Sequence, residues 1–220
     1  MSESAPMGRE RKRRETTRAL ISLARQATAS DGLHGFTIEE LCERAGISRR
    51  TFFNYFASKE DAVLGFALHH DSTEADERFV ARRGAPPTGE ISATLLIDLA
   101  ALYEERWATL EVDRAAVQEL MAATEREPKL IPHMIQRHQQ DEAKDAALVA
   151  RREGLAPHDP RARAAAQMIG HVARIAMPAS LDPDHPRPFA EVLEEQLGIA
   201  SEIFRAQSSA SLPHSPGKHE

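Results

Sequence analysis

The sequence has 220 residues, a formal net charge of −6 and a single cysteine, Cys42, which excludes an intrachain disulfide framework. No apolar run is long enough to cross a bilayer and the first residues are too polar for a signal peptide, so we expect a cytoplasmic protein that does not bind membranes. Alanine is abundant, whereas β-branched and aromatic residues are sparse after the first eighty positions, and this composition predicts an all-α fold.

The chain begins with small polar residues and a concentrated basic run, Arg9-Glu-Arg-Lys-Arg-Arg14, and we expect residues 1–14 to form a disordered basic arm. A first helix is predicted over about residues 15–30, with a buried face formed by Leu20, Leu23, Ala24 and Ala27. Residues 1–66 carry 11 Lys and Arg against 9 Asp and Glu, a net charge of +2, and the remaining residues carry 17 against 25, a net charge of −8. A mildly basic N-terminal part therefore precedes an acidic body.

Local signals predict two short helices joined by a tight turn in the next stretch. Thr37 and Glu40 have the spacing of a capping box, so a helix should begin directly after Thr37. Gly46 follows the last apolar residue of that helix, where a left-handed backbone costs glycine little. Ser48 can cap the second helix, which runs to about Phe56. The inner side of this helix carries Phe52, Phe53 and Phe56, and its outer side or margins carry Arg49, Arg50, Thr51, Asn54 and Tyr55.

Residues 37–61, TIEELCERAGISRRTFFNYFASKED, resemble the DNA-binding signature of the TetR family of bacterial transcriptional regulators. The similarity includes the acidic pair after Thr37, the turn Ala45-Gly46-Ile47-Ser48, the aromatic-rich second helix and Ser58-Lys59, and it covers roughly residues 14–66. The resemblance implies an all-α fold of about nine helices. It implies a three-helix, helix-turn-helix DNA-binding domain over residues 15–66 and a helical effector-binding and dimerisation domain over residues 67–207. Residues 208–220 are expected to form a disordered tail.

The second helix of this motif carries side chains that can read the major groove of DNA. Arginine can bind O6 and N7 of guanine, and threonine can contact the methyl group of thymine. The family pattern implies phosphate contacts for Tyr55 and Lys59, and the helix start at Thr37 also favours a phosphate. The expected DNA contacts are Thr37, Ser48, Arg49, Arg50, Thr51, Asn54, Tyr55 and Lys59. The alternative is that these are solvated polar residues of an amphipathic helix.

The basic run of residues 9–14 has three interpretations. It can simply keep the chain soluble, it can follow DNA phosphates, or it can enter the minor groove. In the last two cases the run would add affinity and salt dependence rather than selectivity for one operator sequence.

After this motif the sequence predicts further helices. A fourth helix, capped by Ser58, is expected from Asp61 to about Arg82. This helix would act as the lever that couples effector binding to DNA binding. The break at residues 84–89, GAPPTG, is the best candidate for a hinge or boundary. The remaining helices are predicted over about residues 90–110, 113–126, 128–152, 161–177 and 188–206.

A helical domain of this size can hold a cavity for an effector between its helices. The side chains considered as its lining are Tyr103, Trp107, Met121, Met134, His138, Met168 and His171. Each of them, taken singly, is also explained as an ordinary core or surface residue. Only four aromatic residues lie beyond residue 80, which disfavours a pocket built on stacking and leaves aliphatic or acyl effectors open. The expected effector is therefore an unknown small molecule.

The sequence shows no pattern that indicates a metal, a cofactor or catalysis. His133 and His138 are five residues apart, which is a poor spacing for two ligands on one helix face, and the other histidines form no metal-binding motif. Neither a nucleophile elbow nor a phosphate-binding glycine loop occurs. We therefore expect no cofactor, no metal and no enzymatic activity.

The last two helices are predicted to form a dimer interface, because the resemblance implies that they pack against their counterparts as a four-helix bundle. The apolar residues assigned to it are Met168, Val172, Ile175, Val192, Leu197 and Ile203. The alternative is that they close the core of a single chain. Together these expectations describe a homodimeric repressor that binds double-stranded operator DNA and is released by a ligand. The open alternatives are an activator or protein-controlled regulator of the same fold, and a helical interaction protein that does not bind DNA.

Overall fold

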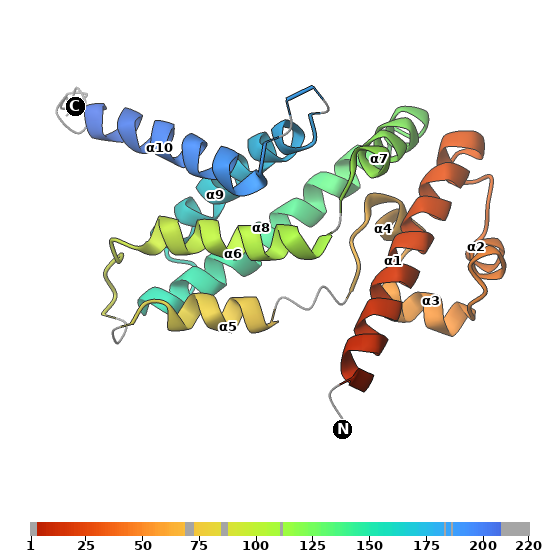
Figure 1. Ribbon diagram of the computed structural model, residues 1–220, viewed down its shortest axis with the longest axis horizontal. Helices are drawn as coiled ribbons and strands as arrows, with labels where there is room; N and C mark the ends of the chain where they lie inside the picture. The colour runs from red at the N-terminus through yellow and green to blue at the C-terminus, as the bar shows by residue number, and fades with distance from the viewer. Residues whose placement is uncertain are drawn as a thin grey trace, which may run out of the picture. The chain divides into compact units, whose positions relative to one another are not determined.

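The computed structural model describes residues 4–68, 73–84, 88–110, 112–182, 184–185 and 187–207, with the backbone alone at residues 4–7, 9, 10, 204, 206 and 207. Within these residues the chain forms ten α-helices and no strand, which confirms the predicted all-α fold (Figure 1). None of these helices is long and apolar enough to span a membrane. Residues 1–3 and 208–220, which we predicted to be disordered, lie outside the described part. The helices are α1 (Ser4–Asp31), α2 (Ile38–Ala45), α3 (Arg49–Tyr55), α4 (Lys59–Leu64), α5 (Thr73–Ala81), α6 (Leu95–Leu110), α7 (Arg114–Arg126), α8 (Leu130–Glu153), α9 (Pro160–Ser180) and α10 (Phe189–Gln207).

The chain packs as two compact units. Unit 1 comprises residues 1–74 and 110–144, and unit 2 comprises residues 75–109 and 145–220. Residues 110–144, which hold α7 and the first part of α8, therefore pack with the helix-turn-helix segment, and α8 contributes to both units. Unit 1 extends past residue 66, and the functional boundary expected at that residue stays a prediction.

Unit 1 is built around α1. This helix packs against α2, α4 and α7, while α2 packs against α3 and α4 packs against α7 (Figure 1). With 7 residues, α3 is too short to be stable alone, so packing has to hold it in place. The core that does so consists of apolar side chains that are at most 1% exposed, among them Leu20, Ala24, Leu41, Phe52, Phe56, Val63, Ala123 and Leu130. Burying one Leu or Phe side chain contributes roughly 1.5–3 kcal/mol.

The predicted caps set the ends of α2 and α3. The Thr37 hydroxyl accepts a hydrogen bond from the Glu40 amide at 3.2 Å, and the Glu40 carboxylate accepts one from the Thr37 amide at 2.7 Å, which confirms the capping box. Gly46 ends α2 in the left-handed region, at φ 66°. The Ser48 hydroxyl accepts from the Thr51 amide at 3.0 Å and so begins α3. Each N-cap of this kind contributes about 1 kcal/mol, so these contacts determine the limits of both helices.

The first helix begins earlier than predicted. α1 starts at Ser4 instead of at about residue 15, so the basic run of residues 9–14 is helical and is not a disordered arm. The sequence pattern failed here because none of the described side chains from Gly8 to Ala19 is buried, and a helix segment without a buried face shows no hydrophobic periodicity.

The predicted fourth helix over residues 61–82 is wrong. α4 ends at Leu64, Gly65 takes φ 86°, and the next helix, α5, begins at Thr73. The Gly65 and Phe66 amides both donate to the Asp61 carbonyl oxygen, at 2.8 and 2.9 Å, which is how a left-handed glycine closes a helix. The chain therefore does not carry the single helical lever that the sequence predicted.

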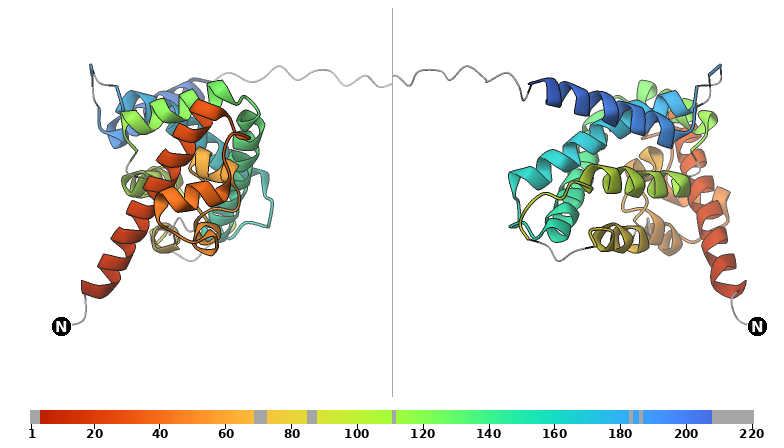
Figure 2. Two further views of the ribbon diagram at one scale, coloured as in Figure 1. Left: turned by 90° about the vertical axis from the view of Figure 1, so that its right-hand side faces the viewer. Right: turned by 60° about the vertical axis from the view of Figure 1, so that its left-hand side comes forward.

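Unit 2 contains α5, α6, the second part of α8, α9 and α10. α9 and α10 pack against each other, as Figure 2 shows from two further sides. The core of this unit consists of side chains that are at most 2% exposed, among them Phe79, Leu99, Leu102, Ile169, Val192 and Leu193. The predicted break at residues 84–89 lies between α5 and α6, and its residues 85–87 are outside the described part. Because both flanks belong to unit 2, the break is a loop within one compact unit rather than a boundary between units.

A buried ionic network closes one end of α8. The side chains of Arg152 and Glu153 are fully buried, and Arg152 is paired with both Glu153 and Asp98. The Arg83 guanidinium donates to Glu153 at 3.1 Å, and Ser92 donates to Glu153 through its amide at 3.0 Å and its hydroxyl at 2.9 Å. Two positive and two negative charges therefore balance, which buried charges require.

Candidate nucleic-acid interface

Aromatic side chains fix α3 to the core of unit 1. Phe52 and Phe56 are fully buried in the core of unit 1, with ring centroids 5.8 Å apart, whereas Phe53 is 39% exposed. Buried positions four residues apart lie on one face of a helix, so the opposite face of α3 turns to solvent. That outer face carries Arg50 and Asn54, both exposed, next to the half-buried Thr51.

The turn between α2 and α3 is held by the backbone. The Gly46 amide donates to the Glu43 carbonyl oxygen at 3.1 Å and the Ile47 amide donates to the Cys42 carbonyl oxygen at 3.0 Å. Ser48 then engages the first turn of α3, because its hydroxyl lies 2.8 Å from the Thr51 hydroxyl. Both predicted contact residues Ser48 and Thr51 therefore use their hydroxyl groups within the protein to fix the orientation of α3.

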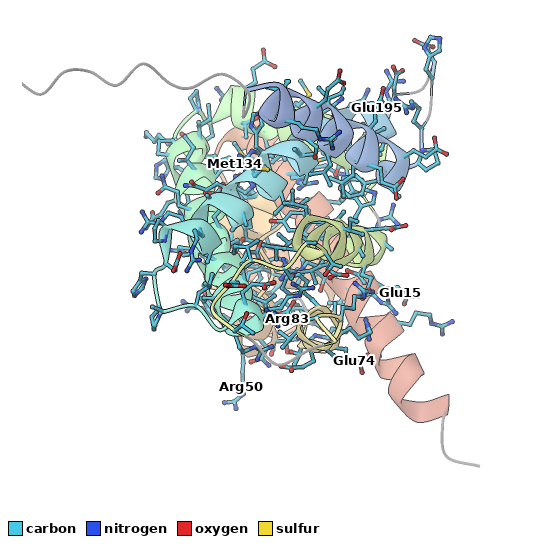
Figure 3. All side chains as sticks on the ribbon, turned by 90° about the vertical axis from the view of Figure 1, so that its left-hand side faces the viewer. Glu15, Arg50, Glu74, Arg83, Met134 and Glu195 are labelled. Carbon is cyan, nitrogen blue, oxygen red and sulfur yellow. The ribbon has the colours of Figure 1, made fainter. Side chains whose placement is uncertain are left out.

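The two neighbouring arginines of α3 are not equivalent. Arg49 forms an ion pair with Glu39 of α2, with 3.0 Å between Nη1 and Oε1, and both side chains are more than half exposed. Its guanidinium also lies 5.5 Å from the centroid of the Phe53 ring. The Arg50 side chain extends away from the ribbon (Figure 3) and has no ion pair with any described side chain. Arg50 is therefore ready to meet a ligand without first giving up a partner.

Tyr55 and Asn54 differ in burial. Asn54 is exposed, whereas the Tyr55 ring is half-buried and packs against the core of unit 1. The Tyr55 carbonyl oxygen also accepts a hydrogen bond from the Leu68 amide at 2.8 Å. Tyr55 can therefore offer its phenol group at the margin of α3 while the rest of the residue anchors the helix.

Lys59 has partners inside unit 1. Its ammonium group donates to the carbonyl oxygens of Leu33 and Phe36, the second at 3.2 Å, and lies 5.1 Å from the centroid of the Phe36 ring. The side chain thus ties the loop between α1 and α2 to the start of α4. The phosphate contact that the resemblance implies for Lys59 stays a prediction, and it would require the ammonium to share or leave these partners.

Thr37 is committed to its capping box. Its hydroxyl lies 3.0 Å from the Glu40 carboxylate, which also accepts from the Thr37 amide. These backbone and side-chain hydrogen bonds hold the pKa of Glu40 below its ordinary value. A phosphate at the start of α2 would therefore meet a carboxylate that is ionised, which weakens the case for Thr37 as a phosphate contact.

Sequence reasoning missed the long-range contacts that hold α4. His133 Nε2 of α8 lies 3.0 Å from a carboxylate oxygen of the buried Asp61 in α4. Nearby, the Arg137 guanidinium lies 5.3 Å from the centroid of the Phe66 ring, and the His138 ring lies 5.6 Å from it. Because these partners are 70 or more residues apart, no local pattern in the sequence could have predicted the pairing.

Arg25 was also missed, although it joins three helices of unit 1. From α1 it donates to the Val63 carbonyl oxygen at the end of α4 and to the Ala116 carbonyl oxygen in α7, both at 2.8 Å. Burial lowers the pKa of Arg25 to about 10, and the charge of Glu119 only partly offsets this. An arginine on the buried face of a predicted helix was the one signal that could have identified it, because such a charge needs partners.

Three of the residues considered as effector contacts belong to unit 1. Met121 is 64% exposed on α7, Met134 packs against the core, and the His138 ring contacts Phe66. An open hollow in this unit is lined by Ala29, Ala122, Glu125 and Arg126, and none of the three contributes to it.

The other four candidates for effector contacts belong to unit 2. The Trp107 ring stacks on the Phe189 ring with 4.8 Å between centroids, and the Tyr103 hydroxyl donates to Asp145 at 2.6 Å. Met168 is half-buried and His171 is exposed on α9. The candidates therefore divide between two units, and their joint role as a pocket lining stays a prediction.

The residues assigned to a dimer interface lie on α9 and α10 and differ in exposure. Val172 and Val192 are buried in the core of unit 2, and Leu197 packs against that core, as the single-chain alternative expects. Ile175 and Ile203 are 43% and 52% exposed, and they are joined on the same two helices by the exposed residues Met177 and Ile199. Of the residues assigned to the interface, Ile175 and Ile203 are therefore the ones exposed to a partner, and Met177 and Ile199 add to them.

The described residues contain no group of three or more His, Cys, Asp or Glu side chains placed to hold a metal ion. Cys42 is buried in unit 1. Burial and the neighbouring carboxylate of Glu39 raise the pKa of its thiol, so this cysteine is held in its unreactive form.

Comparisons with known proteins identify the family to which this chain belongs. The family model described as bacterial regulatory proteins, tetR family, matches residues 20–64, from the buried part of α1 to the end of α4. A solved structure assigned to the TetR family of transcriptional regulators, from Mesorhizobium loti MAFF303099, gives a TM-score of 0.42 at 21% identity, covering 87% of this chain and 96% of that chain. The HTH-type transcriptional regulator TcmR of Streptomyces glaucescens is 33% identical over 160 residues, which make up 70% of this chain and 69% of TcmR. On the family match and this identity, the chain belongs to the TetR family and is a DNA-binding transcriptional regulator, not an enzyme.

Proposed function

We propose that the protein is a homodimeric repressor that binds a two-fold symmetric operator in the cytoplasm and leaves it when a small molecule binds. The observation that supports this most directly is the outer face of α3, where Arg50 is exposed and without an ion pair among the described side chains, beside the exposed Asn54. A rigid helix with free polar side chains, anchored from behind by Phe52 and Phe56, is what major-groove readout requires.

In this proposal Arg50 carries base recognition and Arg49 joins it after leaving Glu39. A guanidinium can bind O6 and N7 of guanine at the same time, and such a contact discriminates against other bases by about 1–3 kcal/mol. Ser48 and Thr51 hold the helix in register, and Tyr55 contacts a phosphate from the margin of α3.

A symmetric operator requires two copies of α3 about one turn of DNA apart, roughly 34–36 Å. The exposed apolar residues of α9 and α10, Ile175, Met177, Ile199 and Ile203, support the pairing of two chains through these helices. Exposed large apolar side chains favour burial against a partner.

Because the single helix predicted over residues 61–82 does not form, effector binding has to be coupled to DNA binding through other helices. The helix α8 contributes to both units, and its first part holds α4 through the His133–Asp61 contact of 3.0 Å. An effector that binds one arrangement of these helices more tightly than another would shift the equilibrium by that difference in affinity.

The experiment that tests base recognition compares Arg50→Ala with the unchanged protein on operator and scrambled duplexes. Loss of one bidentate contact should weaken operator binding about 5- to 150-fold, the equivalent of about 1–3 kcal/mol, and should leave binding to the scrambled duplex within a few-fold. Fluorescence anisotropy measures both, and titration at a DNA concentration above Kd counts the protomers per site. Equal losses on both duplexes would show that Arg50 contacts only phosphate, and one protomer per operator would contradict the dimer.

A further inference from the structure

Asp61 joins the two ends of α4 through its backbone and meets α8 through its side chain. Its amide donates to the Ser58 hydroxyl at 3.0 Å, and its carbonyl oxygen accepts from the Gly65 and Phe66 amides. Its carboxylate is only 6% exposed. With 6 residues, α4 is too short to be stable without tertiary contacts, so the partners of this carboxylate help to determine where α4 lies.

Two side chains of α8 face one oxygen of this carboxylate. His133 Nε2 lies 3.0 Å from Asp61 Oδ1, which is a hydrogen-bond distance, and Arg137 Nε lies 3.6 Å from the same atom, which is too long for one. No other described side chain pairs with the Asp61 carboxylate. Arg137 Nε is buried and has no hydrogen-bond partner among the described residues, although Nη1 of its guanidinium donates to Gln140 at 3.1 Å. A buried N–H group without a partner favours any arrangement that gives it an acceptor.

The spacing of His133 and Arg137 makes them alternative partners for Asp61. Residues four apart lie on one face of a helix, about 6 Å from each other along its axis. Movement of α8 along its axis therefore brings one donor toward Asp61 Oδ1 as it takes the other away. A shift of about 0.6 Å would bring Arg137 Nε to the usual hydrogen-bond distance.

The segment that follows α4 continues this connection to the end of α3. The Phe66 ring lies 5.3 Å from the Arg137 guanidinium and 5.6 Å from the His138 ring, measured to its centroid. Two residues later, the Leu68 amide donates to the carbonyl oxygen of Tyr55, the last residue of α3, at 2.8 Å. Residues 61–68 therefore connect α8 to the C-terminal end of α3 by contacts within unit 1.

The helix α8 runs from Leu130 to Glu153, and its part from residue 145 on belongs to unit 2. We propose that Asp61 is a positioning residue for DNA binding with two exchangeable partners on α8, His133 in the arrangement described above and Arg137 after a small shift of α8. Either donor keeps the buried carboxylate paired, so α4 stays attached while α8 moves. The inference rests on the proposed operator binding and adds to it the joint through which α8 acts on α3.

The test is a double-mutant cycle in the full chain with His133→Ala, Arg137→Met and the two substitutions combined. Each single variant leaves one donor for Asp61, so affinity for an operator duplex enriched from a random pool should fall less than about 3-fold. The combined variant leaves a buried carboxylate without a partner, so its loss should exceed the product of the single losses by about 5-fold or more. Anisotropy measures the affinities, and circular dichroism shows whether each variant is folded in the assay.

Asp61→Asn in the combined variant separates the loss of pairing from the loss of packing. Asparagine has the same shape without the charge, so it should restore affinity by about 3-fold or more. If the combined variant unfolds, the same substitution should restore folding as well as binding. The matched control combines Gln136→Ala with Gln139→Ala, two exposed side chains of α8, and should leave the affinity unchanged.

Two results would overturn the inference: single losses that multiply to the combined loss, or no recovery with Asp61→Asn. Urea titration of the same proteins measures the pairing without DNA and should show the same excess loss in the combined variant. Additive effects in a protein that still selects its operator overturn the exchange of donors alone. If the unchanged protein does not distinguish operator from scrambled duplex, the proposed function fails and the positioning role fails with it, whatever the urea titrations show.

Discussion

At the scale of single residues, Arg49 and Arg50 show that neighbours of one type can have different roles. Arg49 is held by Glu39 at 3.0 Å, while Arg50 has no such partner among the described side chains. To reach a base, Arg49 has to leave Glu39, and an exposed ion pair of this kind is worth about 0.2–1 kcal/mol. Glu39 therefore opposes DNA binding by roughly that amount, and its carboxylate also repels phosphates.

We predict that Glu39→Gln tightens binding to every duplex by about 1.5- to 5-fold, because it frees Arg49 and removes one negative charge. The matched control is Glu43→Gln, which removes an exposed carboxylate from the same helix without breaking an ion pair with Arg49. Anisotropy at a fixed salt concentration measures both variants. Equal effects of the two substitutions would show that the net charge matters and the ion pair with Arg49 does not.

At the scale of helices, the end of α4 depends on a single glycine. Gly65 lies at φ 86°, and a Cβ atom at this position would come 3.2 Å from Arg25 Nη2 and 3.7 Å from Ile21 Cδ1. A left-handed backbone costs a residue with a side chain roughly 1–2 kcal/mol. Arg25 cannot move aside freely, because its guanidinium donates to carbonyl oxygens in α4 and α7.

Gly65→Ala should therefore lower the free energy of unfolding by about 1–2 kcal/mol, measured by urea titration followed by circular dichroism. Gly198→Ala is the control, because this glycine lies inside α10 with no atom within 4 Å of an added Cβ. Alanine there should stabilise the protein by about 0.5–1 kcal/mol. A Gly65→Ala protein as stable as the unchanged one would mean that α4 does not end at Gly65.

The sequence could predict the helix ends that are set by hydrogen bonds between residues close together in the chain. The capping box at Thr37, the left-handed Gly46 and the Ser48 cap each involve residues at most five positions apart, and all three were predicted correctly. Gly65 was overlooked because the apolar spacing continues past it through Phe66 and Ala67, and one glycine within such a pattern does not by itself end a helix.

The sequence could predict which residues belong to the candidate site, but not which other residues they pair with. The helical spacing of Phe52 and Phe56 predicted the buried side of α3 and left Arg50 and Asn54 exposed, but the placement of Phe53 on that side was wrong, because it is 39% exposed. That Arg49 pairs with Glu39 and that Lys59 turns to the carbonyl oxygens of Leu33 and Phe36 depends on how separate elements meet in space. Tertiary contacts of this kind leave no periodic signal in one sequence.

At the scale of the whole molecule, the buried network around Glu153 should make stability depend on pH. Burial alone would raise the pKa of Glu153, but hydrogen bonds from Arg83 and Ser92 and the charge of Arg152 hold it below its ordinary value. A carboxyl group whose pKa is depressed in the folded state stabilises the protein above its unfolded pKa of about 4.3. That stabilisation is lost as the pH falls through the lower, folded pKa.

Glu153→Gln should lower the free energy of unfolding by about 3–5 kcal/mol at pH 7, because it leaves Arg83 and Arg152 buried with too few negative partners. The difference from the unchanged protein should shrink as the pH falls below the unfolded pKa of about 4.3 and through the lower pKa of Glu153 in the folded state. Urea titrations at several pH values measure both quantities. A difference that is independent of pH would contradict an ionised Glu153.

The proposed repressor function requires selective binding of double-stranded DNA by two copies of the chain. The most direct measurement enriches duplexes from a random pool on the purified protein and then determines, by anisotropy across a salt series, its affinity for the enriched duplex and for a scrambled version. We predict at least about 1,000-fold tighter binding to a two-fold symmetric sequence, two protomers per site, and a steep negative dependence of affinity on salt. Equal affinity for both duplexes, or a pool without a shared sequence, would contradict operator recognition by α3.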